Sequence, residues 1–328
     1  GGWQVPPQRV NVGNMTAGSE ATDSQQVRVI EVGPRDGLQN EQQILPVAEK
    51  VQLVQRLVAT GISAVEVTSF VRPDRVPHLA DGVAVFPAVQ KLPGVRYIAL
   101  VPNLAGLQAA AEAGVQEIAV FGAASEQFSQ SNLGRGIDES LKMFAPVAAE
   151  ARLLGMVVRG YVSTVLGCPF SGQVPAENVV RVVRALDEMG CDEISLGDTI
   201  GVGTPHAVND LIAQVETVLA VQRIAVHFHD TYGMGLANSM AAIQAGVRAV
   251  DTSIGGLGGC PFAGRNATGN LATEDLVYAL AGSEFDTGID LDGLLQVNSW
   301  LAERMGRALP SKVAAALLAK RAGTSDAK

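Results

Sequence analysis

Residues 224–254 read IAVHFHDTYGMGLANSMAAIQAGVRAVDTSI, and their hydrophobic pattern changes twice along this stretch. A short run of apolar and β-branched residues, Ile224–Phe228, is followed by a segment with helical periodicity, Gly235–Ala245, and then by a second apolar run, Ala249–Ile254. Gly246 follows the helical segment, where a left-handed position after the helix favours glycine. This order predicts two parallel strands joined by a crossover helix.

The same unit recurs along most of the chain. Eight apolar runs predict strands at Val27–Val32, Ala64–Phe70, Val95–Val101, Glu117–Phe121, Met156–Val162, Glu193–Leu196, Ile224–Phe228 and Ala249–Ile254. Segments with helical periodicity lie between or after them, at Pro46–Ala59, Leu104–Ala113, Asp138–Leu154, Ala176–Met189, Pro205–Leu219, Gly235–Ala245 and Thr273–Ala281. Continuous apolar runs are typical of strands buried on both faces. Eight such units in about 260 residues predict a (β/α)8 TIM barrel, an α/β fold, and the alternative is a doubly wound open sheet.

The two ends of the chain differ from this repeating part. Residues 1–26 are polar, Gly-rich and aperiodic, so we expect a disordered N-terminal tail. Residues 27–288 hold the eight units and form the expected catalytic barrel domain. Residues 289–328 contain two more helical segments, Leu291–Ala308 and Ser311–Ala322, which predict a C-terminal helical extension packed on the barrel or over its mouth.

Composition argues against several classes of protein. The chain has 328 residues, a net charge of −9 and a pI near 5.0, which argues against nucleic acid as a partner because phosphates demand a basic surface. No apolar run approaches the length of about 18 residues that a membrane span needs. Three cysteines, Cys168, Cys191 and Cys260, form neither a CxxC pair nor a disulfide framework. Together with the lack of a secretory signal pattern, this predicts a cytoplasmic protein in a reducing compartment.

Polar side chains gather where the strands are expected to end, and in a barrel these ends carry the reactive groups. His227 and His229 are two of only four histidines, and residues i and i+2 of a strand point to the same face. Asp36 ends the first strand, which lies next to the eighth strand of a closed sheet. Two imidazoles and a carboxylate suit a divalent cation, either a transition metal or, with further oxygen ligands, Mg²⁺ or Mn²⁺. The alternative is that both histidines are ordinary core or surface residues.

Arg35 stands beside Asp36 and cannot lose its charge. Such a cation suits the stabilisation of a developing enolate oxygen. Glu66, on the neighbouring strand, would orient Arg35 or a metal-bound water. The alternative is a structural ion pair between Arg35 and one of these carboxylates, and both interpretations can hold together.

Two loops add further candidates. Cys260 follows the turn Gly255–Gly259, whose glycines let the backbone flex or approach a ligand closely, so its thiol is either exposed and mobile or inert. The glycine run lacks the GxGxxG spacing of a dinucleotide-binding fold. Asn270 offers a carbonyl oxygen to a metal. Cys168 and Cys191 are expected to be structural.

Several segments together resemble the family of 3-hydroxy-3-methylglutaryl-CoA (HMG-CoA) lyases, over about residues 27–313. They are Glu31–Glu41 (EVGPRDGLQNE), Thr68–Val71 (TSFV), Phe121–Glu126 (FGAASE), Arg159–Ser163 (RGYVS), Ser195–Gly201 (SLGDTIG) and Asn270–Leu276 (NLATEDL). A wider group of metal-dependent aldolases and Claisen-type synthases shares the Arg-Asp pair and the His-x-His. The sequence GLGGC at Gly256–Cys260 narrows the resemblance to the lyases.

The resemblance implies a barrel that binds Mg²⁺ or Mn²⁺ and cleaves HMG-CoA to acetoacetate and acetyl-CoA in a retro-Claisen step. The implied metal ligands are Asp36, His227, His229 and Asn270. Arg35 would bind the thioester carbonyl as it becomes an enolate, and Glu66 would support Arg35. Cys260 would serve in proton transfer on a mobile loop, and Asp198 in acid–base work or orientation. Family members are commonly dimers, so we expect a homodimer or a higher homo-oligomer.

The acyl-CoA substrate is assigned further contacts. Besides Arg35, the candidates are polar side chains in or beyond the predicted strands: Gln39, Ser69, Arg159, Tyr161, Ser195 and Thr199. Positive charge for the coenzyme A phosphates would come from Arg72, Arg75 and Lys312.

The chain departs from the family's usual sequence pattern at positions that leave more than one acyl group possible for the substrate. Gly255 stands where the family signature has Ala, and the loop from Cys260 to Asn270 is one residue longer than usual. One competing hypothesis is therefore the same chemistry on a longer 3-hydroxyglutaryl-CoA, such as the isohexenyl compound. A second is an aldolase or Claisen synthase, and a third is a barrel that binds a ligand without catalysis.

Overall fold

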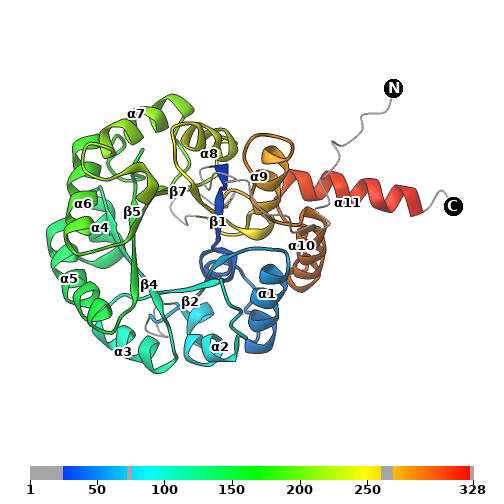
Figure 1. The fold of residues 1–328 in the computed structure, drawn as a ribbon, viewed down its shortest axis with the longest axis horizontal. Helices are drawn as coiled ribbons and strands as arrows, with labels where there is room; N and C mark the ends of the chain where they lie inside the picture. The colour runs from blue at the N-terminus through cyan, green and yellow to red at the C-terminus, as the bar shows by residue number, and fades with distance from the viewer. Residues whose placement is uncertain (1–24, 72–75, 260–268, 326–328) are drawn as a thin grey trace, which may run out of the picture.

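The computed structural model describes residues 25–71, 76–259 and 269–325. Eight parallel strands pair in chain order, and β1 pairs with β8 as well as with β2, so the sheet closes into a barrel (Figure 1). The strands are β1 Arg28–Glu31, β2 Ala64–Ser69, β3 Arg96–Leu100, β4 Glu117–Ala123, β5 Val157–Ser163, β6 Glu193–Asp198, β7 Ile224–Phe228 and β8 Ala249–Thr252. The predicted (β/α)8 barrel is confirmed, and the open sheet is wrong because the two end strands are hydrogen-bonded to each other.

Helices surround the barrel (Figure 1). They are α1 Val47–Ala59, α2 Gly82–Ala88, α3 Leu104–Glu112, α4 Glu126–Leu133, α5 Ile137–Leu153, α6 Ala176–Glu188, α7 Pro205–Val215, α8 Gly235–Gln244, α9 Thr273–Leu280, α10 Leu291–Met305 and α11 Lys312–Ser325. Two of them, α2 and α4, were not predicted from the sequence. Both are short, α2 contains Pro87, and α4 (EQFSQSNL) is mostly polar, so neither carries an apolar stripe that periodicity can detect.

The apolar core lies mainly between the strands and the helices. In α6 the buried residues Val179, Val182, Val183 and Leu186 follow the spacing i, i+3, i+4, i+7, which places all four on the face toward the barrel. Each such side chain contributes about 1.5–3 kcal/mol when fully buried. A second, smaller cluster of apolar side chains is formed by strand residues such as Ile30 on β1.

The C-terminal extension is helical, as predicted. Leu294 and Leu301 of α10 are fully buried and belong to the same core as the barrel helices, and α10 packs against α1 and α9. α11 packs against α9 and projects away from the barrel (Figure 1). The predicted tail is residues 1–26, of which 1–24 lie outside the described residues. Its last position, Gln26, forms an isolated bridge with Asp286. Among the described residues, no helix combines the length and the apolar character that a membrane crossing requires.

Candidate active site

A cavity of about 730 Å³ opens at the C-terminal ends of the strands. Its lining includes eight of the side chains predicted from the sequence: Arg35, Asp36, Gln39, Ser69, Tyr161, Thr199, His227 and His229. Five predicted residues that the structure describes do not line it: Glu66, Arg159, Ser195, Asp198 and Asn270. The site therefore lies where a barrel enzyme carries its chemistry, and its composition is partly as expected.

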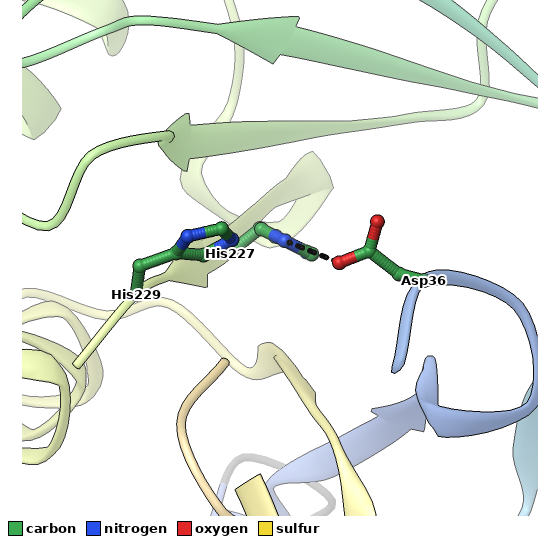
Figure 2. Close-up of side chains that lie close together, drawn as sticks. All are labelled: Asp36, His227 and His229. Carbon is green, nitrogen blue, oxygen red and sulfur yellow. Dashed lines mark ion pairs between the residues drawn. The ribbon is translucent and has the colours of Figure 1, made fainter. Parts of the chain in front are cut away.

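Asp36, His227 and His229 form a cluster at the floor of this cavity. Each residue offers one ligand atom, and these atoms all lie within 4.8 Å of one another. His227 Nε2 is 3.7 Å from Asp36 Oδ2, and the two imidazole rings are 5.4 Å apart between centroids. Figure 2 shows the carboxylate facing the His227 ring, with the His229 ring beside it. The predicted convergence of these three side chains is present in the structure.

The position of Asp36 follows from a tight turn after β1. The one-turn π-helix η2, Gly33–Gly37, begins where the carbonyl oxygen of Val32 accepts hydrogen bonds from the N–H groups of Arg35, Asp36 and Gly37. The turn packs against the end of β8, because a Cβ atom at Gly37 would lie only 2.7 Å from Ser253 Oγ. Glycine at this position lets the Asp36 turn approach β8, and β8 is paired with the strand that carries His227.

The donor set fits a divalent cation. Asn270 is paired with His229 in an isolated bridge, and its Nδ2 donates to Asp36 Oδ2 at 2.8 Å. Asn270 Oδ1 and His229 Nδ1 are buried without a hydrogen-bond partner, which is costly unless a ligand completes them. A carboxylate oxygen, an amide oxygen and two imidazoles are the ligands that Mg²⁺, Mn²⁺ or a related divalent ion accepts.

Burial and charge around the cluster favour the protonation states that metal ligands need at Asp36 and His229, but they shift the pKa of His227 the other way. Burial acts to raise the pKa of Asp36, but the charges of Arg35, His227 and His229 outweigh it and hold that pKa well below its usual range. Burial, followed by the charge of His227, lowers the pKa of His229 to about 4, so this imidazole is neutral at pH 7. For His227, burial acts to lower the pKa, and the hydrogen bond and charge of Asp251 reverse the effect and raise it.

Arg35 is held beside the metal cluster by carboxylates on two sides. Its Nε donates to Glu66 Oε1, and its Nη1 donates to Asp36 Oδ1 at 2.8 Å. Glu66 is completely buried, and its second oxygen accepts a 2.6 Å hydrogen bond from the Tyr161 hydroxyl. Burial raises the pKa of Tyr161 well above its usual value, so the phenol keeps the proton that it donates. The structure contains the ion pair between Arg35 and Glu66, and the guanidinium also lines the cavity, so the catalytic interpretation of Arg35 stays a prediction.

Arg159 and Ser195 were expected at the substrate, and the structure places them one layer deeper. Arg159 is fully buried and donates to Asp251 through both Nη atoms and to Glu193 through Nε. The Ser195 hydroxyl donates to Asp251 Oδ2 at 3.1 Å. Neither side chain reaches the cavity, so the substrate contacts expected for them have no geometric support. The position of a residue along its strand determines how deep its side chain lies in the barrel, and the residue type alone does not show that depth.

Asp198 also lies outside the cavity. It stands three residues after Ser195 in β6, so the alternation of the strand turns it to the opposite face. There its carboxylate accepts hydrogen bonds from the N–H groups of Val202 and Gly203 at 3.2 and 2.8 Å. Burial raises its pKa to about 6. The acid–base role expected for Asp198 is not supported by this geometry, which makes it the hydrogen-bond acceptor of the turn after β6.

The residues expected on the mobile loop and at the coenzyme A phosphates fall mostly in undescribed segments. Cys260, Arg72 and Arg75 lie outside the described residues. Lys312 is exposed at the start of α11, where its Nζ lies 3.2 Å from Asp230 Oδ2.

Several groups at the site were not predicted from the sequence, among them Asp251 and side chains of α4 and its loop. The first is Asp251, which contacts His227. The feature of the sequence that could have identified it is a single carboxylate inside the apolar run of β8. The second group comes from α4 and its C-terminal loop, which line the cavity with Ser131, Asn132 and Arg135. Because α4 was not predicted, these side chains had no place in the expected site.

Comparison with known proteins agrees with this geometry. The sequence model of the HMGL-like family matches residues 26–301. The chain belongs to the HMGL-like family. It is 50% identical over 302 residues to the mitochondrial hydroxymethylglutaryl-CoA lyase of Bos taurus, covering 92% of this chain and 93% of that protein. It is also 50% identical over 294 residues to the 3-hydroxy-3-isohexenylglutaryl-CoA/hydroxy-methylglutaryl-CoA lyase of Pseudomonas aeruginosa, covering 90% of this chain and 98% of that protein.

Solved structures of HMGL-like proteins show the same architecture. The hydroxymethylglutaryl-CoA lyase of Pseudomonas aeruginosa superposes with a TM-score of 0.88 at 50% identity, covering 90% of this chain and 98% of that one. An HMG-CoA lyase of Acinetobacter baumannii, solved in complex with coenzyme A and 3-methylmalate, gives a TM-score of 0.86 at 36% identity, covering 92% of this chain and 97% of that one. Both relatives match nearly their whole length, so the barrel and its C-terminal helices are shared.

Proposed function

We propose that this protein is a divalent-metal-dependent carbon–carbon lyase that cleaves HMG-CoA to acetoacetate and acetyl-CoA. The observation that carries the proposal is the meeting of Asp36, His227 and His229 beside Arg35 in one cavity. Relatives named as HMG-CoA lyases, about 50% identical over most of the chain, support the same activity. They do not favour an aldolase, a Claisen synthase or a barrel without catalysis.

The metal set would be Asp36, His227, His229 and Asn270. A divalent cation bound there supplies Lewis acidity, which lowers the pKa of a hydroxyl on the substrate. Of the two carboxylates expected as the base, Asp36 lines the cavity and Asp198 does not. Asp36 is a poor acceptor of the 3-hydroxyl proton, because Arg35 and the histidines hold its pKa well below its usual range, so this proposal gives it the role of metal ligand.

Bond cleavage then depends on Arg35. The bond between C2 and C3 breaks, and its electron pair moves onto the thioester as an enolate. The hydroxyl carbon becomes the ketone of acetoacetate, and protonation of the enolate carbon gives acetyl-CoA. The guanidinium of Arg35, fixed by Glu66, lines the cavity and in this proposal donates to the developing enolate oxygen. The proton donor proposed from the family resemblance is Cys260, which lies outside the described residues.

The test is turnover of the purified full-length protein on HMG-CoA after loading with Mg²⁺ or Mn²⁺. We expect acetyl-CoA and acetoacetate to form in equal amounts, and treatment with a chelator to stop the reaction until metal is restored. A parallel assay with the isohexenyl thioester measures activity on the longer substrate by its kcat/KM. Metal-loaded, folded protein that releases no acetyl-CoA from HMG-CoA would overturn the proposal.

A further inference from the structure

A layer of buried polar side chains lies beneath the metal cluster. Asp251 of β8 is only 1% exposed and accepts hydrogen bonds from three donors besides His227. Arg159 donates to its two carboxylate oxygens at 2.6 and 3.1 Å, and Ser195 donates to Oδ2 at 3.1 Å. The fourth contact joins Asp251 Oδ2 to His227 Nδ1 at 3.1 Å. The function proposed above uses none of these contacts.

We propose that Asp251, held in place by Arg159, is a positioning residue that keeps His227 in the tautomer with its proton on Nδ1. A carboxylate paired with a guanidinium can only accept at this contact, so the shared proton sits on the imidazole nitrogen. The free lone pair is then on Nε2, the atom that lies 3.7 Å from Asp36 Oδ2. The inference rests on the proposed metal site, because it concerns how one of its ligands is oriented.

Arg159 links this contact to the ion pair between Arg35 and Glu66. Its Nη1 donates to the Tyr161 hydroxyl at 2.7 Å, and that hydroxyl donates to Glu66, the partner of Arg35. One buried guanidinium therefore fixes both the metal-binding imidazole and the cation that faces the substrate. A residue that only filled the barrel interior would need neither connection.

The first test measures metal affinity in the absence of substrate. In Asp251→Asn the side-chain amide can donate to His227 Nδ1, which favours the tautomer whose Nε2 carries the proton and cannot bind metal. We expect Mn²⁺ to bind this variant about 10- to 100-fold more weakly by isothermal titration calorimetry. The matched control is Glu193→Gln, which also removes a carboxylate from Arg159 but touches none of the metal-site residues. Its Mn²⁺ affinity should stay within about threefold of wild type.

The second test needs no variant, so it holds even if Asp251→Asn does not fold. Nitrogen-15 NMR of the imidazoles in the Mg²⁺-saturated wild-type protein reports which ring nitrogen of His227 carries the proton. We expect a protonated Nδ1. An unprotonated Nδ1, or unchanged Mn²⁺ affinity in folded Asp251→Asn, would overturn the inference. Failure of the proposed function is distinguishable from failure of this inference. It would appear as a lack of HMG-CoA cleavage, while the Mn²⁺ affinities and the His227 tautomer are as expected.

Discussion

Arg35 carries a positive charge at a nearly buried position, and two simultaneous contacts hold its guanidinium in one orientation. Its Nε meets Glu66 while its Nη1 meets Asp36, so the planar group is fixed in orientation as well as in place. Burial acts to lower the pKa of Arg35, and the two carboxylates raise it, which leaves the guanidinium charged at every accessible pH.

Arg35→Lys should therefore lower kcat although the charge is kept. A lysine ammonium is a single point donor and cannot hold both carboxylates and the substrate oxygen in the geometry of a guanidinium. We expect a loss of about 10²- to 10³-fold in kcat, the size seen when one oxyanion-stabilising donor is removed, with little change in melting temperature. The control is Arg307→Lys, because Arg307 is exposed and pairs with Glu41 outside the cavity. A kcat within threefold of wild type for Arg35→Lys would contradict this role.

Cys260→Ala tests the proton donor proposed from the family resemblance. A thiol with a pKa near its ordinary value of about 8.5 is a competent acid at neutral pH, and alanine has no proton to give. We expect kcat to fall severely while the thermal unfolding curve is retained. Cys191→Ala makes the same substitution at a buried cysteine away from the cavity and should keep its kcat. An unchanged kcat in Cys260→Ala would exclude the acid role.

At the residue scale, the spacing of residues along a strand predicted which face a side chain points to better than it predicted how deep that side chain lies in the barrel. His227 and His229 were paired correctly because alternation along a strand is a local property. Arg159 and Ser195 were placed too near the substrate, because the level of a side chain inside the barrel depends on strand register. That register is a property of the pairing between neighbouring strands, such as Arg159 of β5 opposite Glu193 of β6, and the sequence of one strand does not show it.

Two buried glutamates join the elements that surround the site. Glu31, at the end of β1, accepts hydrogen bonds at 2.8 Å from the N–H groups of Gly33 and Ile254. Glu274, in α9, accepts from the Gly255 N–H and from Asn298 of α10. Gly33 begins η2, and Ile254 and Gly255 belong to the one-turn 3-10 helix η5, Ile254–Gly256. The two carboxyls therefore hold both turns next to the barrel.

Glu274→Gln should change how stability depends on pH. Burial raises the pKa of Glu274 from 4.5 to about 7. An acid whose pKa is higher in the folded state binds more protons when folded, so its contribution to the free energy of unfolding is present below about pH 4.5 and falls as pH rises to about 7. The shift corresponds to about 3 kcal/mol. Between pH 5 and 8, wild type should lose stability more steeply than Glu274→Gln in urea unfolding.

The matched control for this pH series is Glu303→Gln. Glu303 is an exposed glutamate on α10, and its replacement should give a curve parallel to that of wild type. Parallel curves for wild type and Glu274→Gln would contradict the prediction, because they would show that Glu274 titrates alike in the folded and unfolded states.

At the element scale, long amphipathic helices were predictable and short ones were not. The four buried aliphatic residues of α6 repeat with helical spacing, so its sequence alone predicts a helix. α4 buries little besides Phe128 and depends on a cap, in which Ser125 Oγ accepts from the Phe128 N–H at 3.2 Å. A helix that is stabilised mainly by its contacts in the fold shows only weak hydrophobic periodicity in its sequence.

At the scale of the whole molecule, barrel closure brings distant segments to one place. Asp36 and Asn270 are 234 positions apart, and they are hydrogen-bonded only because β1 closes the sheet against β8. The repeat of eight strand–helix units favoured this closure over an open sheet, and closure predicted that Asp36, His227 and His229 meet. It did not predict that Asp198, at the end of β6, lies outside the cavity. The oligomeric state and the cytoplasmic location stay predictions, because a single chain carries no contact that would test either one.

Metal binding should stabilise the whole barrel, because its ligands come from segments that meet only in the folded state. At a free Mn²⁺ concentration 100 times the dissociation constant, the gain is about 2.7 kcal/mol. For a chain of this size that is about 4 °C in melting temperature, measured by calorimetry with and without the metal. His229→Ala should lose this increment, and His206→Ala, the same change at an exposed histidine of α7, should keep it. Equal increments in both variants would show that the ion stabilises the protein at some other place.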